Sequence, residues 1–260
     1  MPYANNHGVR IYYELEGKGY PLVLAHGLSG NLNHWRKENY ANTLAKNFQL
    51  ILFDARGHGK SDKPHEISDY GLNMVEDIIA VLDHLGITKA HYYGYSMGTR
   101  IGFRAALYHA NRFHAFVLGG ANPYRNQAEI EVEKELLASM QLLADDPQAF
   151  AAQMEKAMHH PLPPEDKKTM LDNDGTALIA IVKAIGQLAP LSEHQLAGIS
   201  NPCLLYCGDR DPRYAGAKKC AGFLANARFI SLPGFDHSVQ AHSDLILPHV
   251  TAFLSETTKT

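Results

Sequence analysis

Gly94-Tyr95-Ser96-Met97-Gly98 is the stretch that decides the fold. It lies between an apolar run, Ala90-His-Tyr-Tyr-Gly94, and a segment with a helical pattern. At a turn from a buried strand into a helix, glycines on both sides of a serine permit the strained bend that lifts the hydroxyl above the sheet. The amide donors and positive dipole end of the following helix point at the same spot. The stretch therefore predicts a nucleophile elbow with Ser96 as the nucleophile.

A serine hydroxyl is a poor nucleophile without a histidine base and a carboxylate that orients it. In this topology both are expected downstream, each at the carboxyl end of a strand. Two apolar runs, residues 202–207 and 227–232, are followed by loops that carry Asp211 and His237. The gap between Asp211 and His237 leaves room for one helix and one strand. The order Ser, Asp, His therefore predicts a catalytic triad.

Two alternatives for the carboxylate can be weighed. Asp209 sits directly after its strand, so Asp211 has the better reach toward a loop histidine. The simpler role of Asp209 is a hydrogen bond within the loop. The strand that ends near Gly119 offers Asn122, an amide, where a carboxylate would be needed. Asp211 is favoured, and Asp209 remains the alternative.

Acyl transfer also requires donors for the developing oxyanion. The first buried strand ends in His26-Gly27-Leu28-Ser29-Gly30, where Gly27 would let the backbone bend so that the Leu28 amide faces Ser96. The Met97 amide, at the start of the elbow helix, is the second expected donor.

The rest of the chain alternates short strands with helical patterns, which indicates a doubly wound α/β sheet. Strands are expected at residues 9–15, 21–26, 49–54, 90–94, 113–118, 202–207 and 227–232. Residues 122–200 contain no strand candidate, and proline-rich breaks separate their helical patterns. We expect an α/β core at 1–121 and 201–260 with a helical cap inserted at 122–200. The charged run Glu129-Ile-Glu-Val-Glu-Lys-Glu135 is most simply a solvated helix face.

Composition excludes several partners. The chain has 260 residues, with 24 Lys and Arg against 27 Asp and Glu, and a net charge of −3. The sequence has no basic face of the kind that binding to a nucleic acid or an anionic membrane would require. No apolar run reaches the roughly 18 residues of a membrane span, and the polar start of the chain lacks a secretory signal, so we expect a cytoplasmic protein. The sequence makes no prediction of oligomeric state.

Neither a metal nor another cofactor is expected. No helix carries a His-x-x-x-His pair, no Cys/His cluster appears, and His159-His160 is a lone pair before Pro161. Gly57-x-Gly59 is too short for a dinucleotide fingerprint. His58 and Arg56 in the same loop could touch substrate, but a role in fixing the loop is favoured.

Taken together, these motifs resemble the α/β-hydrolase fold superfamily over nearly the whole chain. The resemblance rests on His26-Gly27, Asp54-Ala-Arg56-Gly57-His58-Gly59-Lys-Ser61, the elbow at Ser96, Gly208-x-x-Asp211 and Gly234-x-x-His237. It implies a mostly parallel eight-stranded sheet, a triad of Ser96, Asp211 and His237, and an oxyanion hole from the Leu28 and Met97 amides. It also implies a cap that shapes the pocket.

Two details qualify the resemblance. Haloalkane dehalogenases and epoxide hydrolases carry Asp at the elbow, so Ser96 argues against both. Thr99 stands where many relatives have a second glycine, a departure that leaves the triad intact.

The resulting hypothesis is a cofactor-independent serine hydrolase for a small or medium carboxylic ester or lactone. Candidate pocket residues, chosen for their proximity in sequence to the expected motifs, are His26, Trp35, Tyr95, Tyr124 and Phe235. A carbon-carbon bond hydrolase, a thioesterase or a perhydrolase would use the same triad, because the fold does not choose among them. A ligand receptor of this fold with little turnover is the alternative from another class.

Overall fold

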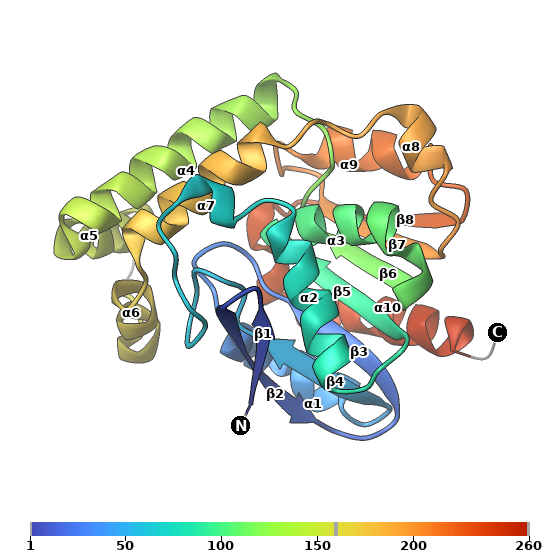
Figure 1. The fold of residues 1–260 in the computed structure, drawn as a ribbon. Helices are drawn as coiled ribbons and strands as arrows, with labels where there is room; N and C mark the ends of the chain where they lie inside the picture. Colours follow the sequence, from blue (N-terminus) through green and yellow to red (C-terminus); the bar gives the residue numbers. More distant parts are fainter. Residues whose placement is uncertain (1, 159–160, 259–260) are drawn as a thin grey trace.

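A single mixed sheet organises the computed structural model, which describes residues 2–158 and 161–258 (Figure 1). In this part of the chain eight strands pair in the order β1-β2-β4-β3-β5-β6-β7-β8. Their bounds are β1 Tyr3–Asn6, β2 Val9–Glu16, β3 Tyr20–Ala25, β4 Phe48–Phe53, β5 Ala90–Tyr95, β6 Phe113–Gly119, β7 Cys203–Gly208 and β8 Ala227–Leu232. Strands β1, β2 and β4 pair antiparallel, and the pairs from β4 through β8 are parallel. The predicted fold class is confirmed.

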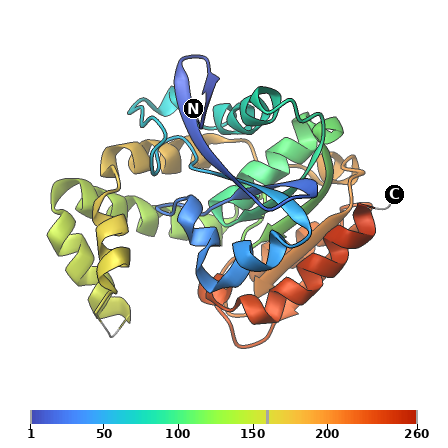
Figure 2. The ribbon, with the colours of Figure 1, turned by 90° about the horizontal axis from the view of Figure 1, so that it is seen from below.

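Helices cover both faces of the sheet. Helices α2 (Asn73–His84), α3 (Met97–Tyr108) and α9 (Tyr214–Ala221) pack on one face, and α1 (Tyr40–Leu44) and α10 (Ser243–Thr257) on the other (Figures 1 and 2). Burial on both faces explains why the parallel strands have continuous apolar runs. In β7, Leu205 packs with apolar side chains on the face of α2, α3 and α9, whereas its neighbours Leu204 and Tyr206 pack on the face of α1 and α10.

The first strand was not predicted from the sequence. Residues Tyr3–Asn6 form β1, and they pair with β2. Asn6 is buried, and its side-chain amide donates to Asp77 Oδ1 of α2 at 2.8 Å. A buried asparagine of this kind breaks the apolar alternation that marks a strand, so the sequence pattern gave no signal here.

Between β6 and β7 the described chain forms helices. They are α4 Gln127–Asp145, α5 Pro147–Met158, α6 Pro164–Leu171, α7 Gly175–Gln187 and α8 Glu193–Ala197. Helices α4 and α7 pack against each other, and α5 and α6 project to one side of the sheet (Figure 2). We refer to residues 122–200 as the cap segment, after the predicted boundaries. The side chain of Asn173 in this segment donates to Ser29 O at 2.9 Å, which joins it to the loop after β3.

Candidate active site

Ser96 stands at the sharp turn between β5 and α3. Its backbone φ is 53°, which is uncommon for a residue with a side chain. The turn brings two backbones so close that side chains are excluded at both flanking glycines. A Cβ on Gly94 would lie 2.5 Å from Gly98 C, and a Cβ on Gly98 would lie 2.1 Å from Ala25 O. This close approach explains why both positions are glycine.

Thr99, the departure from the family pattern, contributes to the same turn. It is fully buried. Its hydroxyl lies 2.9 Å from Gly94 O and 2.7 Å from Gly119 O, so one donor is shared between two carbonyls. Thr99 thus ties the start of α3 to the ends of β5 and β6, and it does not displace Ser96.

Ser96, His237 and Asp211 form one hydrogen-bonded chain. Ser96 Oγ lies 2.9 Å from His237 Nε2, and His237 Nδ1 lies 2.6 Å from Asp211 Oδ2. The structure therefore brings together three side chains that the sequence places in three separate loops. Asp209 instead accepts the N–H of Gly234 at 2.8 Å, which is the loop hydrogen bond considered as its alternative role.

The environment of Asp211 keeps its carboxyl group charged. Burial alone would raise its pKa, but the hydrogen bond and charge of His237 outweigh burial, and the N–H of Arg213 adds a bond to Oδ1 at 2.9 Å. The net effect lowers the pKa of Asp211 below its usual value. A charged Asp211 accepts a hydrogen bond from the Nδ1–H of His237, which leaves the Nε2 lone pair free to accept the proton of Ser96.

The loop after β3 approaches Ser96 from the other side. A Cβ on Gly27 would lie 3.5 Å from Ser96 Cβ. Leu28 and Met97, whose amides are the expected oxyanion donors, line the same cavity as Ser96. Met97 is the first residue of α3, so its N–H has no acceptor within the helix.

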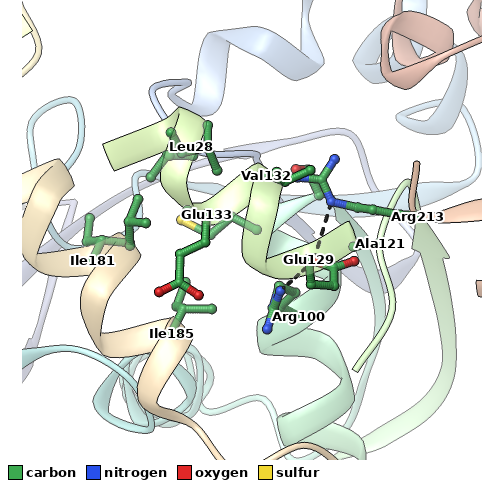
Figure 3. A pocket seen from close by; sticks show the side chains of 14 residues that line it. Leu28, Arg100, Ala121, Glu129, Val132, Glu133, Ile181, Ile185 and Arg213 are labelled. Atoms are coloured by element: carbon green, nitrogen blue, oxygen red, sulfur yellow. Dashed lines mark hydrogen bonds and ion pairs between the residues drawn. The ribbon is translucent and has the colours of Figure 1, made fainter. Parts of the chain in front are cut away.

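This cavity is small and mixed in character (Figure 3). Its volume is about 60 Å³, above the roughly 10–15 Å³ that a cavity needs to hold one water. Its apolar wall comes from Leu28, Met97, Ala121, Val132, Leu136, Ile181, Val182 and Ile185. Its polar wall comes from Arg100, Glu129, Glu133 and Arg213, beside Ser96 and Gly186.

Comparison with known proteins identifies the family. A model described as the alpha/beta hydrolase fold matches residues 20–243. The chain belongs to this family. A proposed carbamate hydrolase of Azorhizobium caulinodans, RutD, is 29% identical over 187 residues, which span 69% of this chain and 66% of that protein, just under two thirds. Other curated relatives are matched over as little as 25% of their own length.

Solved structures of the same fold align over nearly the whole chain. A hydrolase from Pseudomonas aeruginosa PA01 is 25% identical, with a TM-score of 0.83 and coverage of 97% of each chain. An enol-lactonase from Burkholderia xenovorans LB400 is also 25% identical, with a TM-score of 0.80 and coverage of 98% of this chain and 100% of that one.

The five pocket residues predicted for this α/β hydrolase have other surroundings in the structure. None of them is among the residues that line the cavity in the described part of the chain. Trp35 is fully buried and packs on Tyr93 of β5. Tyr95 is buried, Phe235 packs on His242 of the loop after His237, and Tyr124 lines a separate depression.

His26, the fifth of these residues, supports the backbone near Ser96. Its Nε2 accepts the N–H of Ala55 at 3.1 Å, and its Nδ1 therefore donates to Gly27 O at 2.8 Å. Burial lowers the pKa of His26, so the ring is neutral and this tautomer is fixed. His26 holds the loop that carries Leu28 and has no face on the cavity.

His58 and Arg56 also hold loops together, as the sequence favoured. The N–H of Ser29 donates to His58 Nε2 at 3.2 Å, and burial lowers the pKa of His58 well below its usual value. Arg56 Nε donates to Asp77 Oδ2 at 2.6 Å in a buried ion pair with α2.

The charged wall of the cavity was not predicted. Glu129 is buried and Glu133 lines the cavity, so the interpretation of residues 129–135 as a solvated face is wrong at these two positions. Arg100 could have been found from the sequence, because it follows Ser96 by one helical turn on the same helix. Arg213, two residues after Asp211, carried a similar signal.

Two absences hold for residues 2–158 and 161–258. No helix there combines the length and apolar character required to cross a bilayer. No three His, Cys, Asp or Glu side chains in the same ranges are arranged to hold a metal ion. The pair His159-His160 lies outside the described residues.

Proposed function

We propose that this member of the α/β hydrolase family is a serine hydrolase that cleaves a small carboxylic ester or lactone through an acyl-enzyme. The observation that carries the proposal is the hydrogen-bonded chain from Ser96 Oγ through His237 to Asp211, at 2.9 and 2.6 Å. Ser96, at one end of this hydrogen-bonded triad, lines a cavity together with Leu28 and Met97, the two residues whose amides would bind an oxyanion.

The mechanism follows from the direction of each hydrogen bond. His237 Nε2 takes the proton of Ser96 Oγ as the oxygen attacks the carbonyl carbon, and Asp211 stabilises the imidazolium. The oxyanion accepts from the Leu28 and Met97 amides. His237 then returns the proton to the leaving alkoxide, and the C–O bond breaks. Water, activated by His237, hydrolyses the acyl-enzyme and restores Ser96.

Two features of the cavity support a small, mainly apolar acyl group, and the similar proteins support a carbonyl substrate. The cavity measures about 60 Å³, and aliphatic side chains of α4 and α7 form much of its wall. The enol-lactonase among the similar structures and the proposed carbamate hydrolase both have names that describe carbonyl substrates. Cleavage of an ester or lactone requires the same carbonyl addition.

Turnover of p-nitrophenyl acetate, p-nitrophenyl octanoate and δ-valerolactone tests the proposal. We expect the acetate ester to have a kcat/KM at least tenfold above the octanoate ester, because a volume of about 60 Å³ beside Ser96 suits the shorter acyl chain. Rapid multiple turnover would also exclude a receptor of the same fold. Absence of turnover with all three compounds, with Ser96 unlabelled by a fluorophosphonate, would overturn the proposal.

A further inference from the structure

A line of alternating charges runs from His237 to helix α4 of the cap segment. Arg213 Nη1 lies 3.3 Å from His237 Nδ1 and 3.7 Å from Asp211 Oδ1. Arg213 Nε lies 3.7 Å from Glu129 Oε2. The same carboxylate oxygen accepts from Arg100 Nη1 at 2.9 Å. Figure 3 shows Glu129 between the two arginines, which reach it from different elements.

These charges are largely shielded from solvent. The Glu129 side chain is 3% exposed and that of Arg213 is 10% exposed. Fully buried Asn122 donates to Glu129 Oε1 at 2.8 Å, and its Nδ2 also lies 3.3 Å from Arg213 O. Glu129 lies in the first turn of α4, where the helix dipole favours a carboxylate. The arrangement is fixed, and its charges interact more strongly than they would in water.

Arg213 approaches His237 as a cation, without a hydrogen bond to the ring. Asp211 Oδ2 accepts a hydrogen bond from Nδ1–H at 2.6 Å, so Nδ1 has no lone pair for a second donor. A positive guanidinium therefore faces a ring that must become positive during the reaction. Such a neighbour disfavours the imidazolium. Glu129 opposes this effect, because it carries the opposite charge on the far side of Arg213.

We propose that Arg213 and Glu129 are positioning residues that set the pH range in which His237 acts as a base. Arg213 extends the active range to lower pH, and Glu129 limits that extension. Because Glu129 belongs to α4, the seating of the cap segment on the core sets the charge balance at the triad. The activity readout of this proposal rests on the proposed function.

Other groups also face His237, and they remain unchanged in the variants below. Asp211 faces it from the loop after β7, and Ser96 from the elbow. The Tyr95 ring of β5 lies 5.3 Å from the histidine ring, centroid to centroid. Asp236 precedes it in its own loop.

The test is the pH dependence of kcat/KM for p-nitrophenyl acetate in two single variants. In Arg213→Met we expect the acid limb to move to higher pH by about one unit, because a cation beside the imidazolium is removed. In Glu129→Gln we expect it to move to lower pH, because two arginines lose their counter-charge. Arg213→Lys should restore most of the wild-type profile. The proposal would be overturned if the acid limb moved in the same direction in both variants, or if it failed to move in one or both of them.

The matched controls replace solvent-exposed residues that carry the same charges as Arg213 and Glu129. Arg210 is exposed in the same loop as Arg213, and Glu131 is 52% exposed on α4, two residues from Glu129. Arg210→Met and Glu131→Gln should leave the acid limb in place. A shift in either control as large as that in its buried counterpart would contradict the specific role of the buried pair.

A second measurement is independent of turnover. The ring titration of His237 can be followed by NMR, with the signal assigned by its absence in His237→Gln. We expect its midpoint to move in opposite directions in Arg213→Met and Glu129→Gln. Absent turnover and an unlabelled Ser96 would refute the proposed function alone, whereas unmoved NMR midpoints would refute the charge coupling alone.

Discussion

The hydroxyl of Tyr95 donates a hydrogen bond to the backbone carbonyl of His237 at 2.6 Å. Tyr95 directly precedes Ser96, so one residue of β5 holds the loop of the base while its neighbour carries the nucleophile. Burial raises the pKa of Tyr95 well above its usual value, so the phenol stays protonated and remains a donor. The spacing of Ser96 and His237 thus depends on a residue that touches neither reacting atom.

Tyr95→Phe removes this hydrogen bond and keeps the ring. We expect the free energy of unfolding to fall by about 1 kcal/mol, which lowers Tm by about 2–4 °C in a chain of this size. We also expect kcat for p-nitrophenyl acetate to fall severalfold, because the His237 loop is less firmly held. Tyr108→Phe, at a side chain that is 54% exposed, is the matched control. Equal kcat values in Tyr95→Phe and wild type would show that the bond has no role in positioning.

The sequence predicted the parts of the site that depend on local geometry. Ser96 was identified because a buried strand, two glycines and a helix adjoin it. Asp211 and His237 were identified because each follows the end of a strand, and parallel strands end at one edge of the sheet. These inferences require the order of strands and helices but not the packing of side chains.

The cavity wall could not be predicted in the same way. The packing of the cap segment on the core decides which faces of α4 and α7 point toward Ser96. Glu129 illustrates the difficulty, since its partner Arg100 is 29 positions away in sequence. On α4 alone, a glutamate among charged residues is typical of a solvated face.

The elbow glycines give a stability prediction. In Gly98→Ala the new Cβ would lie 2.1 Å from Ala25 O, a backbone atom that cannot move aside. We expect a loss of about 3 kcal/mol or more in the free energy of unfolding. In Gly198→Ala, where φ is −76° and the new Cβ would lie 3.4 Å from Gln195 O, the change should stay within about 0.5 kcal/mol. Urea unfolding of both variants measures this difference, and similar losses would contradict the account of the turn.

Asp211 gives a prediction for the pH dependence of stability. Its pKa is lowered from the ordinary 3.8 in the folded chain, so the unfolded chain binds the proton more tightly. Its contribution to stability is present above about pH 4 and is lost as the pH falls through the lower folded value. The Asp211→Asn variant lacks this pH-dependent contribution, because an amide does not titrate in this range. Between about pH 6 and about pH 3, the free energy of unfolding should therefore fall more in wild type than in the variant. Parallel curves in urea unfolding would show that Asp211 makes no such contribution.

The central claim is that Ser96 carries the acyl group during turnover. The most direct measurement mixes the protein with excess p-nitrophenyl acetate, quenches it in acid before the steady state, and maps the acetyl group by mass spectrometry of peptides. We predict one acetyl group on Ser96 in wild type and in Ser68→Ala, a change at an exposed serine. In Ser96→Ala we predict no acetylated peptide and a fall in kcat of about 10⁶-fold. An acetyl group on another residue, or turnover retained in Ser96→Ala, would contradict the account.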